Sequence, residues 1–126
     1  MSKSQKLKDK LRENFEFNPT PQQDEIINEI SDFVTTIGNR SIFLLKGYAG
    51  TGKTTLVSTL VKSLSVVAKR SSLLAPTGRA AKVLSGYSKK QAFTIHKKIY
   101  WIKTNSKGNP FVTLQENLNS NCIFIV

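Results

Sequence analysis

The sequence predicts an α/β domain with a mainly parallel sheet, on three observations. Residues 41–46 form a short, almost wholly apolar run, which is followed by a glycine-rich turn and then by apolar residues at helical spacing. Residues 71–75 form a second apolar run that again leads through a turn into a helical pattern. Strands that alternate with helices in this way pair in parallel, because each connection crosses back over the sheet. Ligands are therefore expected at the carboxyl ends of these strands.

The chain of 126 residues carries a net charge of +11, which favours a polyanionic partner. Seven of the eight acidic residues lie at or before Asp32, whereas fourteen of the nineteen Lys and Arg residues follow it. A basic body of this kind is typical of nucleic-acid binding, and a lysine-rich soluble surface is the alternative. Cys122 is the single cysteine, and no apolar run approaches the ~20 residues of a membrane span. We expect a cytoplasmic protein without a membrane partner or a disulfide-linked partner.

The first 18 residues are rich in charge and precede the expected domain, which begins at residue 19. Leu7, Leu11 and Phe15 recur at every fourth position and form a thin apolar stripe on a helix. Because the stripe is narrow, we expect this segment to dock weakly and to be mobile.

A helix is predicted to begin after Thr20, which is a favourable N-cap and is followed by Pro21 at the first helical position. Gln23 admits two roles. As a structural residue it closes a capping box by accepting a hydrogen bond from the Thr20 N–H, and as a functional residue it reads the edge of an adenine. The spacing alone favours the capping box. The apolar face of this helix comprises Ile26, Ile27, Ile30, Phe33, Val34 and Ile37.

The glycine-rich turn, residues 47–55, reads GYAGTGKTT and fits the pattern of a phosphate-binding loop. Its glycines allow successive backbone N–H groups to converge on phosphates, and the helix that follows adds the positive end of its dipole. Lys53 is expected to reach the β- and γ-phosphates, and Thr54 to bring its hydroxyl to Mg²⁺. The expected cradle consists of Gly47, Ala49, Gly50, Thr51, Gly52, Lys53, Thr54 and Thr55.

The second strand, at residues 71–75, leads into Thr77, Gly78 and Arg79 at the start of a helix, where a phosphate is readily bound. A simple turn and helix cap is an equally supported reading of this segment. After a basic, turn-rich loop at residues 86–91, Thr94 is placed to cap a short helix. His96 is the only histidine, and we do not expect it to bind a metal.

Residues 100–104 and 111–114 are predicted to pair as a hairpin around a turn at residues 105–110. Its aromatic side chains could stack on bases or form a small core of the hairpin, and we favour the core for Trp101. Residues 121–126 form a final apolar strand of the buried type.

Three segments together resemble the superfamily 1 ATP-dependent DNA helicases of the RecD-like and Dda-like branch: residues 47–55, 75–81 (APTGRAA) and 94–96 (TIH). The resemblance implies an incomplete RecA-like P-loop NTPase domain over residues 19–126, with a small hairpin insertion. It also implies that Gln23 is the adenine-reading glutamine, and that Lys53 and Thr54 are the catalytic phosphate and magnesium residues. The hairpin at about 100–114 corresponds to a strand-separating pin. The implied DNA contacts are Pro76, Thr77, Gly78, Arg79, Thr94 and His96.

In that family the last apolar strand is followed by an Asp-Glu pair that holds Mg²⁺ and activates water, whereas this sequence ends at Val126. We therefore expect the chain as printed to bind ATP and single-stranded or forked DNA but to hydrolyse ATP negligibly. The implied activity of the whole protein is translocation on single-stranded DNA with unwinding of duplex. The alternatives are another P-loop NTPase, either a clamp-loader-like ATPase or a small-molecule kinase, and a non-hydrolysing module that binds ATP and DNA.

Overall fold

The computed structural model describes residues 1–36, 41–47, 52–117 and 121–126. The chain divides into two compact units, Met1–Arg70 and Ser71–Val126. The N-terminal helix, which precedes the domain predicted to begin at residue 19, packs within the first unit. Among the helices of the described residues, none is both long enough and apolar enough to cross a membrane.

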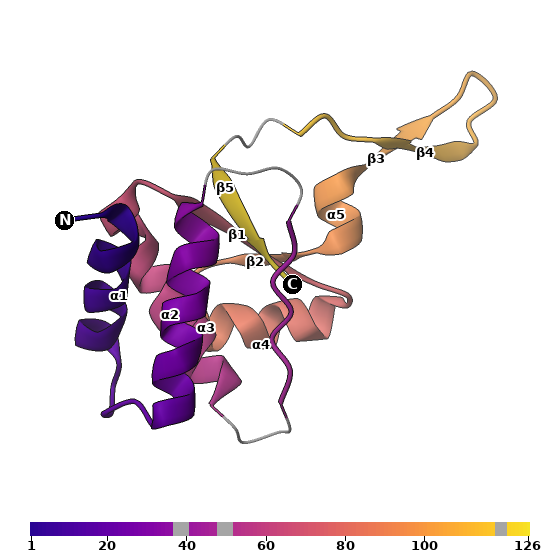
Figure 1. The fold of residues 1–126 in the computed structure, drawn as a ribbon. Helices are drawn as coiled ribbons and strands as arrows, with labels where there is room; N and C mark the ends of the chain where they lie inside the picture. Colours follow the sequence, from indigo (N-terminus) through magenta and orange to yellow (C-terminus); the bar gives the residue numbers. More distant parts are fainter. Residues whose placement is uncertain (37–40, 48–51, 118–120) are drawn as a thin grey trace. The chain divides into compact units, whose positions relative to one another are not determined.

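The first unit is built from helices (Figure 1). Helix α1 packs against α2, against α3 and against the short 3₁₀ helix η1 that continues α3. The bounds of these elements are α1 Lys3–Asn14, α2 Pro21–Thr35, α3 Lys53–Ser63 and η1 Leu64–Val67.

Helix α1 is a core element of this unit, which corrects the expectation of weak docking. Ser2 caps the helix, because its side chain accepts a hydrogen bond from the Gln5 N–H at 3.1 Å. Leu7 and Leu11 have no exposed surface, and Phe15 is also buried. The stripe is narrow, but one helical face suffices to bury three large side chains when two partner helices cover it.

Residues 41–46 do not form the predicted strand. The described segment 41–47 has no regular secondary structure, and Ile42 and Leu44 are 91% and 71% exposed. The ring of Phe43 packs instead against Phe33 of α2, with 5.6 Å between the ring centroids. An apolar run becomes a strand only when a neighbouring strand accepts its backbone hydrogen bonds, and the strand pairs of the described residues do not include this segment.

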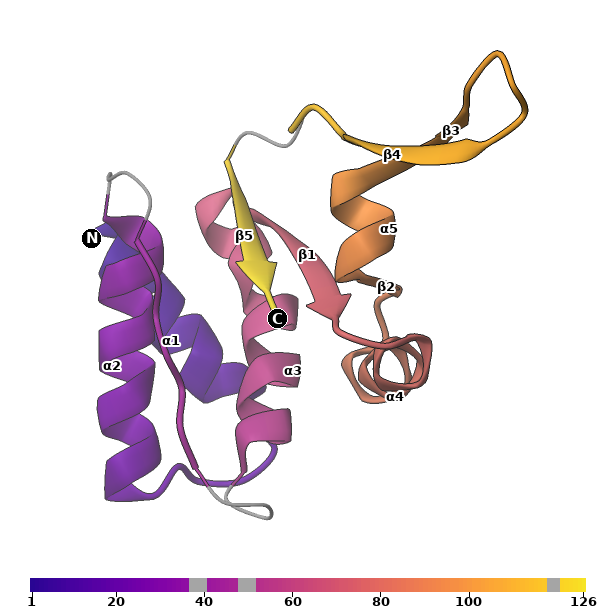
Figure 2. The ribbon, with the colours of Figure 1, turned by 90° about the vertical axis from the view of Figure 1, so that its right-hand side faces the viewer.

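The second unit contains the sheet, and this confirms the predicted α/β class with a mainly parallel sheet. Its three strands lie in the order β2-β1-β5, and β1 pairs in parallel with β2. Figure 2 shows β5 running in the same direction as β1. The strands and helices of this unit are β1 Arg70–Ala75, α4 Gly78–Ser88, β2 Ala92–Thr94, α5 Ile95–Ile99, β3 Tyr100–Thr104, β4 Pro110–Leu114 and β5 Cys122–Ile125.

The local predictions for this unit agree with the structure in part. The hairpin of β3 and β4 is antiparallel, and Asn105 and Gly108 close its turn. Helix α4 extends to Ser88, however, into the stretch predicted to be a loop, and it ends where Lys89 adopts a left-handed conformation with φ of 56°. The last strand is only half-buried, and Phe124 is 41% exposed, so the buried-type prediction for β5 was wrong.

Candidate nucleotide site and nucleic-acid interface

The phosphate loop meets α3 at Gly52. Gly52 occupies the N-cap position with φ of +86°, a left-handed conformation that favours glycine, and its carbonyl accepts the first helical hydrogen bond from the Leu56 N–H at 3.0 Å. Because glycine has no side chain, it cannot cap the N–H groups of the first helical turn. N–H groups at the start of a helix can donate hydrogen bonds to a bound anion. Of the predicted cradle, Ala49, Gly50 and Thr51 lie outside the described residues.

Lys53, at the start of α3, is hydrogen-bonded to Gly47, at the other end of the phosphate loop. Its ammonium group donates a hydrogen bond to the carbonyl oxygen of Gly47. A phosphate oxygen would accept a stronger, charge-assisted hydrogen bond from the same ammonium group. Thr54, the next residue of α3, is exposed at the same helical end, and Thr55 is half-buried. The first turn of α3 therefore carries a cation, a hydroxyl and backbone N–H groups that Gly52 does not cap with a side chain, and this chemistry suits a nucleotide phosphate with Mg²⁺.

Gln23 closes the predicted capping box and also lies against the phosphate loop. Its side-chain oxygen accepts a hydrogen bond from the Thr20 N–H at 2.9 Å, and its own N–H donates to the Thr20 hydroxyl at 3.2 Å. Its side-chain nitrogen Nε2 lies 2.9 Å from the place that a Cβ atom would occupy at Gly52. The two roles that the sequence offered for Gln23 are therefore compatible, since the cap uses its oxygen and leaves its NH₂ group at the loop.

Among the described residues, no group of three His, Cys, Asp or Glu side chains is arranged to hold a metal ion. At the loop, the Thr54 hydroxyl and the phosphate oxygens of a bound nucleotide would be oxygen ligands for Mg²⁺. This donor set suits Mg²⁺, which keeps several waters and takes few protein ligands at phosphate sites.

The predicted DNA-contacting segments follow the carboxyl ends of two neighbouring strands of the sheet. The last residue of β1, Ala75, is in register with Thr94, the last residue of β2, because the two strands are parallel. Residues 76–79 and 94–96 therefore follow neighbouring strand ends. The six predicted DNA contacts all lie at or just after the carboxyl ends of these two strands: Pro76, Thr77, Gly78, Arg79, Thr94 and His96.

At these strand ends, Thr77 and Thr94 act as helix caps. The Thr77 hydroxyl accepts from the Ala80 N–H at 3.1 Å, and the Thr94 hydroxyl accepts from the Lys97 N–H at 3.2 Å. Arg79 and His96 are exposed, and the His96 ring packs on Tyr100 with 5.3 Å between centroids. The cap reading of Thr77 is confirmed, and Arg79 is left as the exposed cation at the start of α4.

The hairpin has two chemically different faces. The register places Trp101 opposite Thr113 and Lys103 opposite Phe111, and side chains of directly paired residues share a face. Trp101 is 56% exposed and Phe111 is 42% exposed, so the favoured reading of Trp101 as hairpin core was wrong. The opposite face is mainly apolar and carries Ile102 across from Val112 and Tyr100 across from Leu114.

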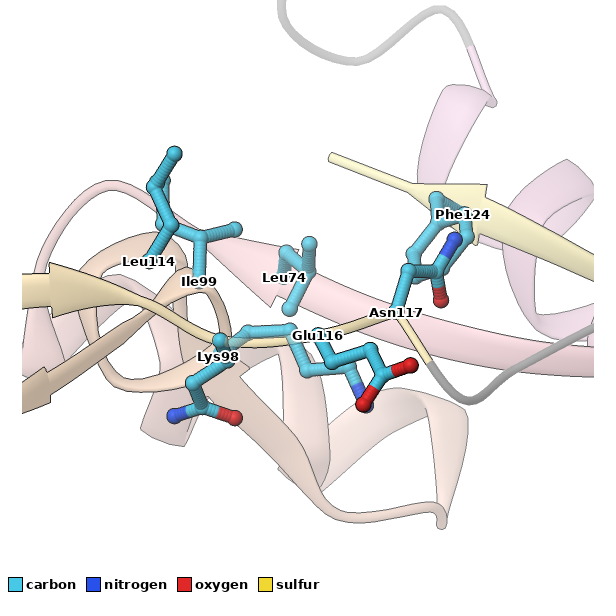
Figure 3. A pocket seen from close by; sticks show the side chains of 8 residues that line it. Leu74, Lys98, Ile99, Leu114, Glu116, Asn117 and Phe124 are labelled. Atoms are coloured by element: carbon cyan, nitrogen blue, oxygen red, sulfur yellow. The ribbon is translucent and has the colours of Figure 1, made fainter.

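A cavity of about 600 Å³ at the base of the hairpin was not predicted from the sequence (Figure 3). Gln115 anchors that base, because its side-chain NH₂ group donates to the carbonyls of Lys97 at 2.9 Å and Tyr100 at 2.8 Å. No periodic pattern marks this residue, since its partners are backbone carbonyls. The lining residues are Leu74, Lys98, Ile99, Leu114, Gln115, Glu116, Asn117 and Phe124.

Comparison with protein-family models gives a match over most of the chain. The family model described as AAA domain matches residues 30–126, so the match begins within α2 and includes the phosphate loop, the sheet and the hairpin. No curated protein and no solved structure matches the chain.

Proposed function

We propose that this chain, which belongs to the AAA domain family, is the ATP-binding part of an ATP-dependent DNA helicase of the RecD-like and Dda-like type. The observation that carries the proposal is the junction at Gly52, where the phosphate loop opens α3 and the Gln23 amide lies against the loop. A phosphate site beside a base-reading amide is the minimum that a purine nucleotide needs.

In this proposal the backbone N–H groups at the start of α3 and the Lys53 ammonium group bind the phosphates. The Thr54 hydroxyl would hold Mg²⁺, which when bound neutralises charge on the phosphate oxygens. Gln23 would donate a hydrogen bond from Nε2 to a ring nitrogen of the adenine. Hydrolysis of the bound ATP would drive movement along one DNA strand.

The residues at the carboxyl ends of β1 and β2 would bind the DNA. Arg79 is an exposed cation beside the cap at Thr77, Lys97 is another beside the cap at Thr94, and the basic body of the chain supplies further positive charge. Such contacts neutralise phosphates and release counterions, so binding should weaken steeply as salt rises. The exposed Trp101 would add sequence-tolerant stacking on a base.

Nucleotide binding can be tested with a fluorescent ATP analogue. We expect Lys53→Ala to weaken binding at least ~10-fold, because a charge-assisted hydrogen bond is worth roughly 1.5–3 kcal/mol. Lys62→Ala is the matched control, since Lys62 is an exposed lysine in the last turn of the same helix. Equal affinities of wild type and Lys53→Ala would refute the site.

The rival enzyme class can be tested in the same assay. If the chain is part of a helicase, we expect single-stranded DNA to change the affinity for the nucleotide in a salt-dependent way and small phosphate acceptors to have no effect. Competition by small phosphate acceptors but not by DNA would point to a small-molecule kinase instead.

A further inference from the structure

Helix α1 joins the two helices that carry the nucleotide site. Arg12 donates from Nε to the Asp24 carboxylate at 2.8 Å and from Nη2 to the Asn28 side-chain oxygen at 2.9 Å, and both acceptors are on α2. Two residues later, the Asn14 side-chain NH₂ group donates to the Ser63 hydroxyl on α3 at 3.0 Å. The last turn of α1 therefore ties α2, which carries Gln23, to α3, which begins at the phosphate loop.

These ties rest on a rigid support. Leu7 and Leu11 on the same helix have no exposed surface, so α1 cannot shift along its partners without opening the core. Asp24, which accepts from Arg12, directly follows Gln23 in the first turn of α2. The planar guanidinium group holds two α2 residues one helical turn apart, which resists both rotation and sliding of that turn.

The orientation of the Gln23 amide is set by the capping box. The Thr20 N–H is a donor only, so the group that faces it must be the amide oxygen. The NH₂ group then points away from Thr20, and Nε2 lies at Gly52. An amide in this orientation offers an N–H donor to the nucleotide, and its partner must be an acceptor such as the N7 atom of a purine.

We propose that Arg12 is a positioning residue of the nucleotide site: through Asp24 and Asn28 it holds Gln23 so that Nε2 donates to N7 of the bound purine. The inference rests on the proposed ATP site and adds to it a helix that lies wholly before the AAA domain match, which begins at residue 30. The N-terminal helix thereby takes part in base selection.

The test compares the dissociation constants of ATP and 7-deaza-ATP, in which a C–H group replaces N7. For the wild-type chain we expect ATP to bind roughly 2- to 10-fold more tightly, the effect of one hydrogen bond. Gln23→Ala should bring the ratio of the two dissociation constants to about 1, and Arg12→Ala should lower this ratio towards 1. Arg12→Lys retains the contact with Asp24 and should therefore preserve part of the preference for ATP. The double variant Gln23→Ala, Arg12→Ala should show the same ratio as Gln23→Ala alone, because both changes remove the same interaction with the purine.

Lys10→Ala is the matched control, since Lys10 pairs with Glu13 on α1 itself, and we expect it to leave the ratio unchanged. Circular dichroism checks that each variant is folded. If Arg12→Ala does not fold, Asn28→Ala removes one of the two acceptors at lower structural cost and should still lower the ratio.

The outcomes separate this inference from the proposed function. ATP binding that depends on Lys53, with the same ratio in wild type and in the Arg12 and Asn28 variants, would overturn the positioning role and leave the ATP site intact. A ratio of about 1 in the wild type would show that Nε2 does not contact N7 and would also overturn it. Loss of Lys53-dependent binding altogether would remove the ATP site and the inference with it.

Discussion

Two leucines provide a matched test of where the core of the first unit lies. Leu11 is fully buried in α1, whereas Leu44, in the run that the sequence predicted to be a covered strand, is 71% exposed. We expect Leu11→Ala to lower the free energy of unfolding by about 2–5 kcal/mol and Leu44→Ala to lower it by less than about 0.7 kcal/mol.

These magnitudes follow from burial. Leu→Ala removes three carbons, which are worth about 0.8 kcal/mol each when fully buried, or about 2.4 kcal/mol in all. At Leu11 the cavity left behind adds to this loss, up to the ~5 kcal/mol seen for rigid sites. At Leu44 less than a third of the side chain is covered, so less than a third of that sum can be lost.

Urea denaturation followed by circular dichroism measures both variants. With a slope of about 2 kcal/mol per molar urea, Leu11→Ala should move the midpoint down by at least ~1 M, and Leu44→Ala by less than ~0.4 M. Equal shifts would refute the assignment of α1 to the core. A large shift for Leu44→Ala would mean that residues 41–46 are covered, as the sequence alone had suggested.

Three further predictions concern the nucleic-acid interface and the α1–α2 contact. Trp101 is the only tryptophan, so its fluorescence reports on the hairpin alone, and we expect single-stranded DNA to quench it; an unchanged spectrum at saturating DNA would remove the stacking role. Arg79→Ala should reduce the salt slope of log K for single-stranded DNA by about 0.7, measured by fluorescence anisotropy, whereas a change in affinity with an unchanged slope would mean that Arg79 does not contact a phosphate. A hydrogen bond from Ser4 and the ion pair with Lys8 lower the pKa of Asp32. The stability that this carboxylate contributes is therefore present above its unfolded-state pKa of about 3.9, and it is lost as pH falls through the lower folded-state pKa. The gap in urea midpoint between wild type and Asp32→Asn should therefore be wider at pH 6 than at pH 3, and a constant gap would contradict the coupling.

The sequence by itself determined the features that depend on neighbouring residues. Thr20, Thr77 and Thr94 cap the helices that follow them, and the hairpin pairs as its strand pattern predicted. The parallel arrangement of β1 and β2 also followed from the alternation of strands and helices. These features are local or nearly local, since a cap forms within four residues and a hairpin within about fifteen.

Only the tertiary structure decided which apolar runs are covered and where the Gln23 amide points. The run at residues 41–46 is more apolar than α1, yet Leu11 is buried and Ile42 is exposed, because burial depends on which distant elements are available as partners. The capping box of Gln23 could be predicted from three-residue spacing, but the approach of its Nε2 atom to Gly52, 29 positions later in the sequence, could not. Such contacts join residues far apart in the chain, and no periodic pattern in the sequence encodes them.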